Sequence, residues 1–175
     1  MTQEVIFAGF GGQGILSMGK FLAYAGMDAN LNVSWLPSYG PEMRGGTANC
    51  SVILSKEPVG SPIVTEPSSV IVMNRPSLDK FEESMVKGGL LIMDSDLVNR
   101  DAERKDIEVI KIPAQSEAEK LGSKKIANMI LLGALVKKTG IVSMEELLAA
   151  LKAHGKEKFY EVNKAALEKG AEYAK

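Results

Sequence analysis

The chain has 175 residues, of which 45% are hydrophobic and 25% are charged, a balance typical of a folded globular protein. Its formal net charge of -1 provides no basic field for nucleic acid or for an anionic membrane surface, so we expect neither as a partner. A single cysteine excludes an intrachain disulfide and cannot by itself supply an iron–sulfur cluster or a cysteine-rich zinc site.

The N-terminal segment predicts a buried strand, a glycine turn and a helix. Residues 5–8 read Val-Ile-Phe-Ala, and residues 9–14 read Gly-Phe-Gly-Gly-Gln-Gly. Gly19 and Gly26 would let the following helix approach a sheet closely. The apolar face of this helix is marked by residues at helical spacing: Ile15, Met18, Leu22 and Ala25.

Two further strands are expected on either side of a loop. Residues 32–36 form one candidate, and residues 47–54 form the other. In the second, the apolar side chains alternate with polar ones at Thr47, Asn49 and Ser51. Because no helix connects the two strands, we expect them to pair antiparallel.

The middle of the chain alternates strands and one helix. Pro76 suits the first turn of a helix that would carry Leu78, Phe81 and Met85 and end at residues 88–89, a glycine pair. Residues 56–67 contain three prolines and a glycine and are expected to form a loop. The remaining strand candidates are residues 70–73, 90–93 and 108–112.

From Ala114 onward the chain is predicted to be helical to its end. Ser123 can cap an apolar helix over residues 124–138, and Ser143 with Glu146 forms a capping-box pattern. A final helix is expected to bury one face formed by Phe159, Val162, Ala166 and Tyr173.

Apolar strands that alternate with helices predict an α/β fold. We expect a Rossmann-like, mainly parallel sheet with helices on both faces and a helical C-terminal segment. No repeat or linker divides the sequence, so a single domain over residues 1–175 is expected.

Two observations bear on location. Residues 1–4 form no charged n-region and no long apolar h-region follows, so we expect no signal peptide. The longest strongly apolar segment, residues 126–136, contains Asn128 and is too short to span a bilayer core of about 30 Å. A cytoplasmic protein without a membrane partner is therefore expected.

The glycine turn matches a dinucleotide-binding pattern only in part. Gly9, Gly11 and Gly14 fit G-x-G-x-x-G between a strand and a helix. Gly11 is therefore expected where the backbone meets a ligand or a loop, and Gly14 where the helix meets the strand. The second strand, however, ends in Trp-Leu-Pro-Ser at residues 35–38, where a ribose-binding acid would stand, and no arginine lies close by. NAD, NADP and FAD thus lack their usual partner. A helix N-terminus suited to an anion remains, and so does the alternative that the glycines serve only packing.

The loop after the second strand combines groups that suit an anionic partner. A Gly-Pro pair forces a turn, and Gly45 and Gly46 free the backbone to expose N–H groups beside Arg44. Such a loop could bind phosphate or carboxylate. The alternative is a structural loop in which Glu42 and Arg44 pair with neighbouring side chains. Asp94 and Asp96 end a strand and are expected to serve capping or solvation rather than a metal.

The glycine turn, together with Ser-Tyr-Gly-Pro-Glu-Met-Arg-Gly-Gly at residues 38–46, closely resembles the gamma subunit of 2-oxoacid:ferredoxin oxidoreductases, especially those acting on 2-oxoglutarate or ketoisovalerate. The likeness extends over essentially the whole chain. The expected ligand-site or subunit-interface residues are Gly9, Gly11, Gly12, Gln13, Gly14, Ser38, Tyr39, Gly40, Pro41, Glu42, Met43, Arg44, Gly45, Gly46, Thr47 and Asn49.

This resemblance implies a multi-subunit enzyme with alpha, beta and possibly delta subunits. The complex would use thiamine diphosphate, Mg and Fe-S clusters held mostly elsewhere, convert a 2-oxoacid and coenzyme A to acyl-CoA and carbon dioxide, and pass electrons to ferredoxin. We expect this chain to bind no cofactor alone, to carry no catalytic residue and to help complete an active site or a coenzyme A site at an interface. A free-standing nucleotide- or CoA-binding module without a redox role is the alternative.

Overall fold

In the computed structural model, which describes residues 1–38 and 48–175, every strand candidate of the sequence is confirmed, and β1 and β2 are longer than predicted. The strands are β1 (Thr2–Gly9), β2 (Asn32–Ser38), β3 (Ala48–Ser55), β4 (Ser69–Val72), β5 (Leu90–Asp94) and β6 (Glu108–Ile112). The α-helices are α1 (Ile15–Asp28), α2 (Arg75–Phe81), α3 (Ala114–Lys120), α4 (Ala127–Thr139), α5 (Met144–His154) and α6 (Tyr160–Glu172), with short 3-10 turns η2 (Lys124–Ile126) and η3 (Glu157–Phe159).

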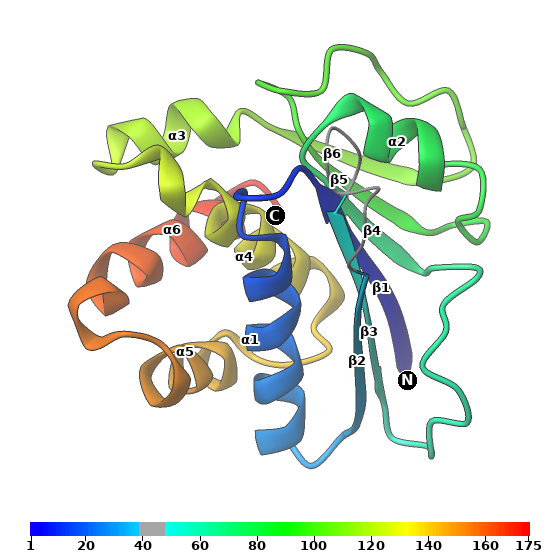
Figure 1. Ribbon diagram of the computed structural model, residues 1–175, viewed down its shortest axis with the longest axis horizontal. Coiled ribbons are helices and arrows are strands. Elements are labelled where there is room, and N and C mark those ends of the chain that lie inside the picture. Colours follow the sequence, from blue (N-terminus) through cyan, green and yellow to red (C-terminus); the bar gives the residue numbers. More distant parts are fainter. Residues whose placement is uncertain (39–47) are drawn as a thin grey trace.

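The strands form one sheet in the order β2-β3-β1-β4-β5-β6 (Figure 1). Strands β1, β4, β5 and β6 pair in parallel. Strand β3 is antiparallel to both β1 and β2, and its pairing with β2 confirms the expectation from a connection without a helix. The carboxyl ends of the parallel strands therefore meet at one edge, where ligands bind in α/β folds.

Helices cover both faces of the sheet, as predicted (Figure 1). Alternate side chains of β1 divide between two cores: Val5 and Phe7 belong to the larger cluster, with α1 and α4, and Ile6 and Ala8 belong to the smaller one, with α2. Gly19 in α1 lies so close to β3 that a Cβ atom would stand 2.5 Å from Cys50 Sγ. The expected close approach of α1 to the sheet is confirmed.

The C-terminal segment is helical, as expected, and its predicted caps are present. The Ser143–Glu146 capping box is complete, and Ser123 Oγ accepts a hydrogen bond from the Lys125 N–H at the start of η2. The predicted buried face of the last helix is wrong at its ends. Phe159 and Tyr173 are 44% and 37% exposed, because α6 packs on α4 through small residues that let the two backbones touch. At this contact Gly133 of α4 lies against the backbone of Leu167, and Gly170 of α6 lies against the backbone of Ile130.

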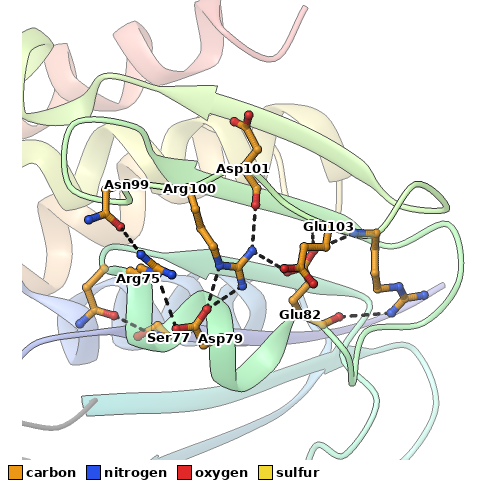
Figure 2. Close-up of polar contacts among 10 residues, drawn as sticks. Arg75, Ser77, Asp79, Glu82, Asn99, Arg100, Asp101 and Glu103 are labelled. Atoms are coloured by element: carbon orange, nitrogen blue, oxygen red, sulfur yellow. Dashed lines mark hydrogen bonds and ion pairs between the residues drawn. The ribbon is translucent and has the colours of Figure 1, made fainter.

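Helix α2 ends at Phe81 and not at the predicted glycine pair. The backbone carbonyl groups just after α2 accept hydrogen bonds from a side chain much later in the sequence. Arg104 Nη1 donates to the backbone oxygens of Glu82 at 3.2 Å and Met85 at 2.6 Å. In return, the buried Glu82 carboxylate accepts from Arg100 Nη1 at 3.0 Å and from the Arg104 N–H at 2.9 Å (Figure 2). These hydrogen bonds satisfy the carbonyl groups where α2 ends and hold the segment before β6 against that end of the helix.

Candidate functional site

The glycine turn joins the carboxyl end of β1 to α1. Gly12 and Gly14 have φ values of 88° and 74°, a left-handed conformation that favours glycine. Gln13 fixes the turn with both ends of its amide: Oε1 accepts from the Phe10 N–H at 2.6 Å, and Nε2 donates to the Met73 carbonyl oxygen at 3.2 Å. Because Met73 directly follows β4, the turn is tied to the neighbouring parallel strand.

The N-terminus of α1 faces a cavity of about 360 Å³. No described side chain caps this helix, and its first turn contains no acidic residue. The first-turn N–H groups and the positive end of the helix dipole therefore favour an anion. The cavity is lined by Phe10, Gly11, Gly12, Gly14, Ile15, Leu16, Ser17 and Ala48.

Two of the predicted site segments meet at this edge through the register of the sheet. Gly9 pairs with Ala48 across β1 and β3, and Ser38 pairs with Asn49 across β2 and β3. Of the residues that flank positions 39–47, Ala48 thus lies beside the glycine turn, and Ser38 lies one strand further along the same edge. The other predicted site residues, Tyr39, Gly40, Pro41, Glu42, Met43, Arg44, Gly45, Gly46 and Thr47, lie outside the described residues.

The neighbours of the individual glycines differ from the expectation in one case. A Cβ atom on Gly14 would overlap the amide of Asn128 near the start of α4, so this glycine meets a second helix rather than the strand. The strand contact belongs to Gly9, whose Cβ would stand 3.1 Å from Met73 Cβ. Around Gly11 no described atom lies within 4 Å of such a Cβ. Gly11 is therefore open to whatever approaches the turn.

A second cavity, of about 180 Å³, also has Gly12 in its wall and is lined by residues that the sequence patterns did not single out. Lys124, Lys125 and Gln115 line it together with Gln13 and Asn128. One signal was available: Asn128 is a polar residue inside an otherwise apolar helix. Lys124 and Lys125 gave no such signal, because only the fold brings η2 and the start of α4 to the glycine turn.

A buried carboxyl group accepts a hydrogen bond from one of the residues that line this second cavity. Asp94, at the end of β5, is 0% exposed, and its Oδ2 accepts a hydrogen bond from Gln115 Nε2 at 2.9 Å. Burial raises the pKa of Asp94, and the hydrogen bond from Gln115 opposes that shift. Asp96 Oδ2 accepts from the Ser116 N–H at 2.7 Å near the start of α3, so the expected capping role is confirmed for Asp96.

The described residues do not fit a metal ion or an iron–sulfur cluster. They contain no group of three or more histidine, cysteine, aspartate or glutamate side chains placed to hold a metal. Burial raises the pKa of the Cys50 thiol to about 12, which opposes the thiolate that a metal needs. In the same part of the chain, none of the helices combines the length and the apolar character needed to cross a bilayer.

The family is shown by a direct match. A family model described as pyruvate ferredoxin/flavodoxin oxidoreductase matches residues 4–173. This chain belongs to that family. Its membership agrees with the resemblance carried by the glycine turn and residues 38–46.

Among relatives in the pyruvate ferredoxin/flavodoxin oxidoreductase family, ketoisovalerate oxidoreductase subunit VorA of Methanothermobacter thermautotrophicus is 40% identical over 98% of this chain. The chain spans only 36% of the length of that relative. The 2-oxoglutarate synthase subunit KorC of Methanocaldococcus jannaschii is 35% identical over 100% of this chain and 95% of its own length.

Solved structures of the family share the fold. The keto/oxoacid ferredoxin oxidoreductase gamma subunit from Geobacter sulfurreducens superposes with a TM-score of 0.90 at 31% identity and covers 99% of this chain and 97% of its own. The 2-oxoglutarate:ferredoxin oxidoreductase from Magnetococcus marinus, solved with 2-oxoglutarate, coenzyme A and succinyl-CoA bound, gives 0.87 at 25% identity and covers 99% of this chain and 31% of its own.

Proposed function

We propose that this chain is the gamma component of a multi-subunit 2-oxoacid:ferredoxin oxidoreductase and contributes an anion site for coenzyme A at a subunit interface. One observation carries the proposal: Gly9 pairs with Ala48, so the first described residue after the Arg44-containing segment lies beside the glycine turn that opens α1. The backbone N–H groups at the start of α1, together with the guanidinium that Arg44 would add, suit the phosphates of coenzyme A.

The complex would oxidatively decarboxylate a 2-oxoacid, transfer the acyl group to coenzyme A, release carbon dioxide and pass the electrons to ferredoxin. Thiamine diphosphate with Mg²⁺ and iron–sulfur clusters in the alpha, beta and possibly delta subunits would supply the decarboxylation and the electron transfer. The share of this chain is to bind and orient: the glycine turn presents N–H groups, and Arg44 would neutralise negative charge. No residue of this chain is assigned to the catalytic step.

We assign coenzyme A rather than the oxoacid to this chain because the named oxoacid differs between relatives. VorA is named for ketoisovalerate and KorC for 2-oxoglutarate, although both share this domain. A domain that stays the same while the oxoacid changes is better suited to the common co-substrate than to the oxoacid. The bound coenzyme A named for the Magnetococcus marinus enzyme supports the same assignment. We place the complex in the cytoplasm, in contact with ferredoxin.

Co-purification from the native host tests this function. A tag on this chain should retain alpha and beta subunits, identified by their intact masses, and the complex should reduce a viologen dye only when a 2-oxoacid and coenzyme A are both present. The chain alone should show no turnover. If the chain purifies without companions and still binds coenzyme A, the free-standing module is the correct reading. Turnover by the chain alone would contradict the assignment of the chemistry to other subunits.

A further inference from the structure

We propose that the cavity lined by Lys124, Lys125 and Gln115 is a second anion site that binds a terminal phosphate monoester. The inference rests on the proposed function, since it gives the chain two phosphate sites, whose cavities share Gly12 in their walls. Coenzyme A carries phosphate in two places, a pyrophosphate and a 3′-phosphate. The site at the start of α1 would take the first and the lysine-lined cavity the second.

The size of the cavity favours a single compact group. Its volume of about 180 Å³ is half of the roughly 360 Å³ at the start of α1, and the two cavities share Gly12 in their walls. Pockets for whole nucleotides or drug-sized ligands begin at about 300 Å³. One phosphate therefore suits the smaller cavity better than a nucleoside does.

The charged residues that line the cavity are of one sign. Lys124 and Lys125 line it, no acidic residue is among its described lining residues, and neither lysine forms an ion pair with a described residue. Both belong to η2, directly before the 13-residue helix α4. The N-terminus of a helix already carries positive partial charge, so two ammonium groups there repel it. A bound anion would be attracted by both ammonium groups and by the helix N-terminus, and this attraction would offset the repulsion between them.

Three side-chain amides line the cavity, and the nitrogen of each donates one hydrogen bond to a described residue. Gln13 Nε2 donates to the Met73 carbonyl oxygen, Gln115 Nε2 to the Asp94 carboxylate, and Asn128 Nδ2 to the Gly14 carbonyl oxygen. A primary amide has two N–H donors, so each nitrogen keeps a second hydrogen. Asn128 is only 6% exposed, and it lines the cavity. Donors held in place by buried partners bind an anion at little entropic cost.

Calorimetric titration of the full chain with coenzyme A and with dephospho-coenzyme A, which lacks the 3′-phosphate, isolates this site. The chain should bind coenzyme A about tenfold or more tightly than the dephospho form, as expected for one charge-assisted contact. The ratio should fall towards one in Lys125→Gln and in Lys124→Gln, with little change for dephospho-coenzyme A. Lys137→Gln removes the same charge from the other end of α4 and should keep the full ratio.

A melting experiment gives a second readout without coenzyme A. Inorganic phosphate should raise the melting temperature of the wild-type chain more than that of the Lys124→Gln/Lys125→Gln double variant. In phosphate-free buffer the double variant should melt at the same temperature as the wild type or higher, because repulsion at the start of α4 is relieved. A lower melting temperature there would identify the lysines as structural and overturn the inference.

The outcomes separate this inference from the proposed function. Equal weakening of both ligands by Lys125→Gln, or no effect on either, would overturn the phosphate assignment and leave a coenzyme A site at the glycine turn. If the wild-type chain binds neither form, the coenzyme A site itself fails, and the inference fails with it.

Discussion

Asn128 donates a hydrogen bond from Nδ2 to the carbonyl oxygen of Gly14 at 3.1 Å, although the two residues are 114 positions apart in the sequence. The bond joins the start of α4 to the turn that opens α1. The ligand edge of the sheet is therefore built by two helices together. Its geometry depends on a contact that forms only when both halves of the chain have folded.

Replacing Asn128 with leucine should destabilise the chain by about 1–3 kcal/mol, because the Gly14 carbonyl oxygen loses its buried partner. The free energy of unfolding in urea measures the effect. Asn32→Leu is a matched control, since Asn32 also donates to a carbonyl oxygen, that of Lys56, but at an exposed position. That variant should stay within about 0.5 kcal/mol of wild type. Equal losses in the two variants would argue against the importance of the buried bond.

Gly14→Val should cost about 1–3 kcal/mol through overpacking against Asn128, with added strain from a φ of 74°. Gly11→Val, in open space, should leave the urea midpoint almost unchanged. An unchanged midpoint for Gly14→Val would show that α1 and α4 do not meet as closely as described. A binding defect in Gly11→Val without loss of stability would support ligand approach at Gly11.

Glu82→Ala should destabilise the chain by about 1.5–3 kcal/mol, because Arg100 and the Arg104 N–H lose a buried charged partner. Asp79 also pairs with Arg100, but its side chain is 53% exposed, so Asp79→Ala should cost less than about 1 kcal/mol. Chemical denaturation of both variants compares them directly. If the two losses are the same, the buried hydrogen bonds of the Glu82 carboxylate contribute no more to stability than a surface ion pair does.

Stability should fall at high pH because of Cys50. Burial raises the pKa of this thiol from 9.0 to about 12, so the folded state favours the protonated form. The contribution is complete below pH 9 and is lost as the pH rises from 9 towards 12, by up to about 1.4 kcal/mol per pH unit. The unfolding free energy of the wild type should therefore fall more steeply above pH 9 than that of Cys50→Ala. Parallel curves for the two proteins would contradict the shift.

Arg44→Ala should impair the assembled enzyme more than the fold of the chain. Loss of one charge-assisted contact typically weakens binding by about 1.5–3 kcal/mol, or roughly 10- to 150-fold. Three measurements are needed: the melting temperature of the lone chain, subunit association, and KM for coenzyme A and for the oxoacid. A higher KM for coenzyme A with intact assembly is the expected result. A lower melting temperature that accounts for every other change would instead identify a structural ion pair.

Local patterns in the sequence predicted the architecture well. The apolar runs identified the strands, and the Ser143–Glu146 capping box is present as expected. The absence of a helical pattern between β2 and β3 predicted their antiparallel pairing. These features depend on neighbouring residues, so the sequence contains the necessary signal. The end of α2 depends instead on Arg104, whose side chain takes the carbonyl groups after the helix. No local pattern could indicate that contact.

The sequence predicted only the part of the candidate site that is formed by the first 50 or so residues. The glycine turn and the flanks of residues 39–47 were expected together, and the register of β3 brings Ala48 next to Gly9. Lys124 and Lys125 were missed because they follow the turn by more than a hundred residues and resemble an ordinary charged helix start. Gly14 was assigned to the wrong neighbour for the same reason: its contact with Asn128 is set by how two distant helices pack.

The junction at Ser38 and Ala48 has a consequence for how such enzymes diverge. Ser38 is anchored by its pairing with Asn49, and Ala48 by its pairing with Gly9, so each flank is held by a ladder that does not depend on residues 39–47. The register of the sheet therefore fixes both flanks at the ligand edge. We expect a substitution between Ser38 and Ala48 to change what binds at this edge before it changes the pairing of the strands.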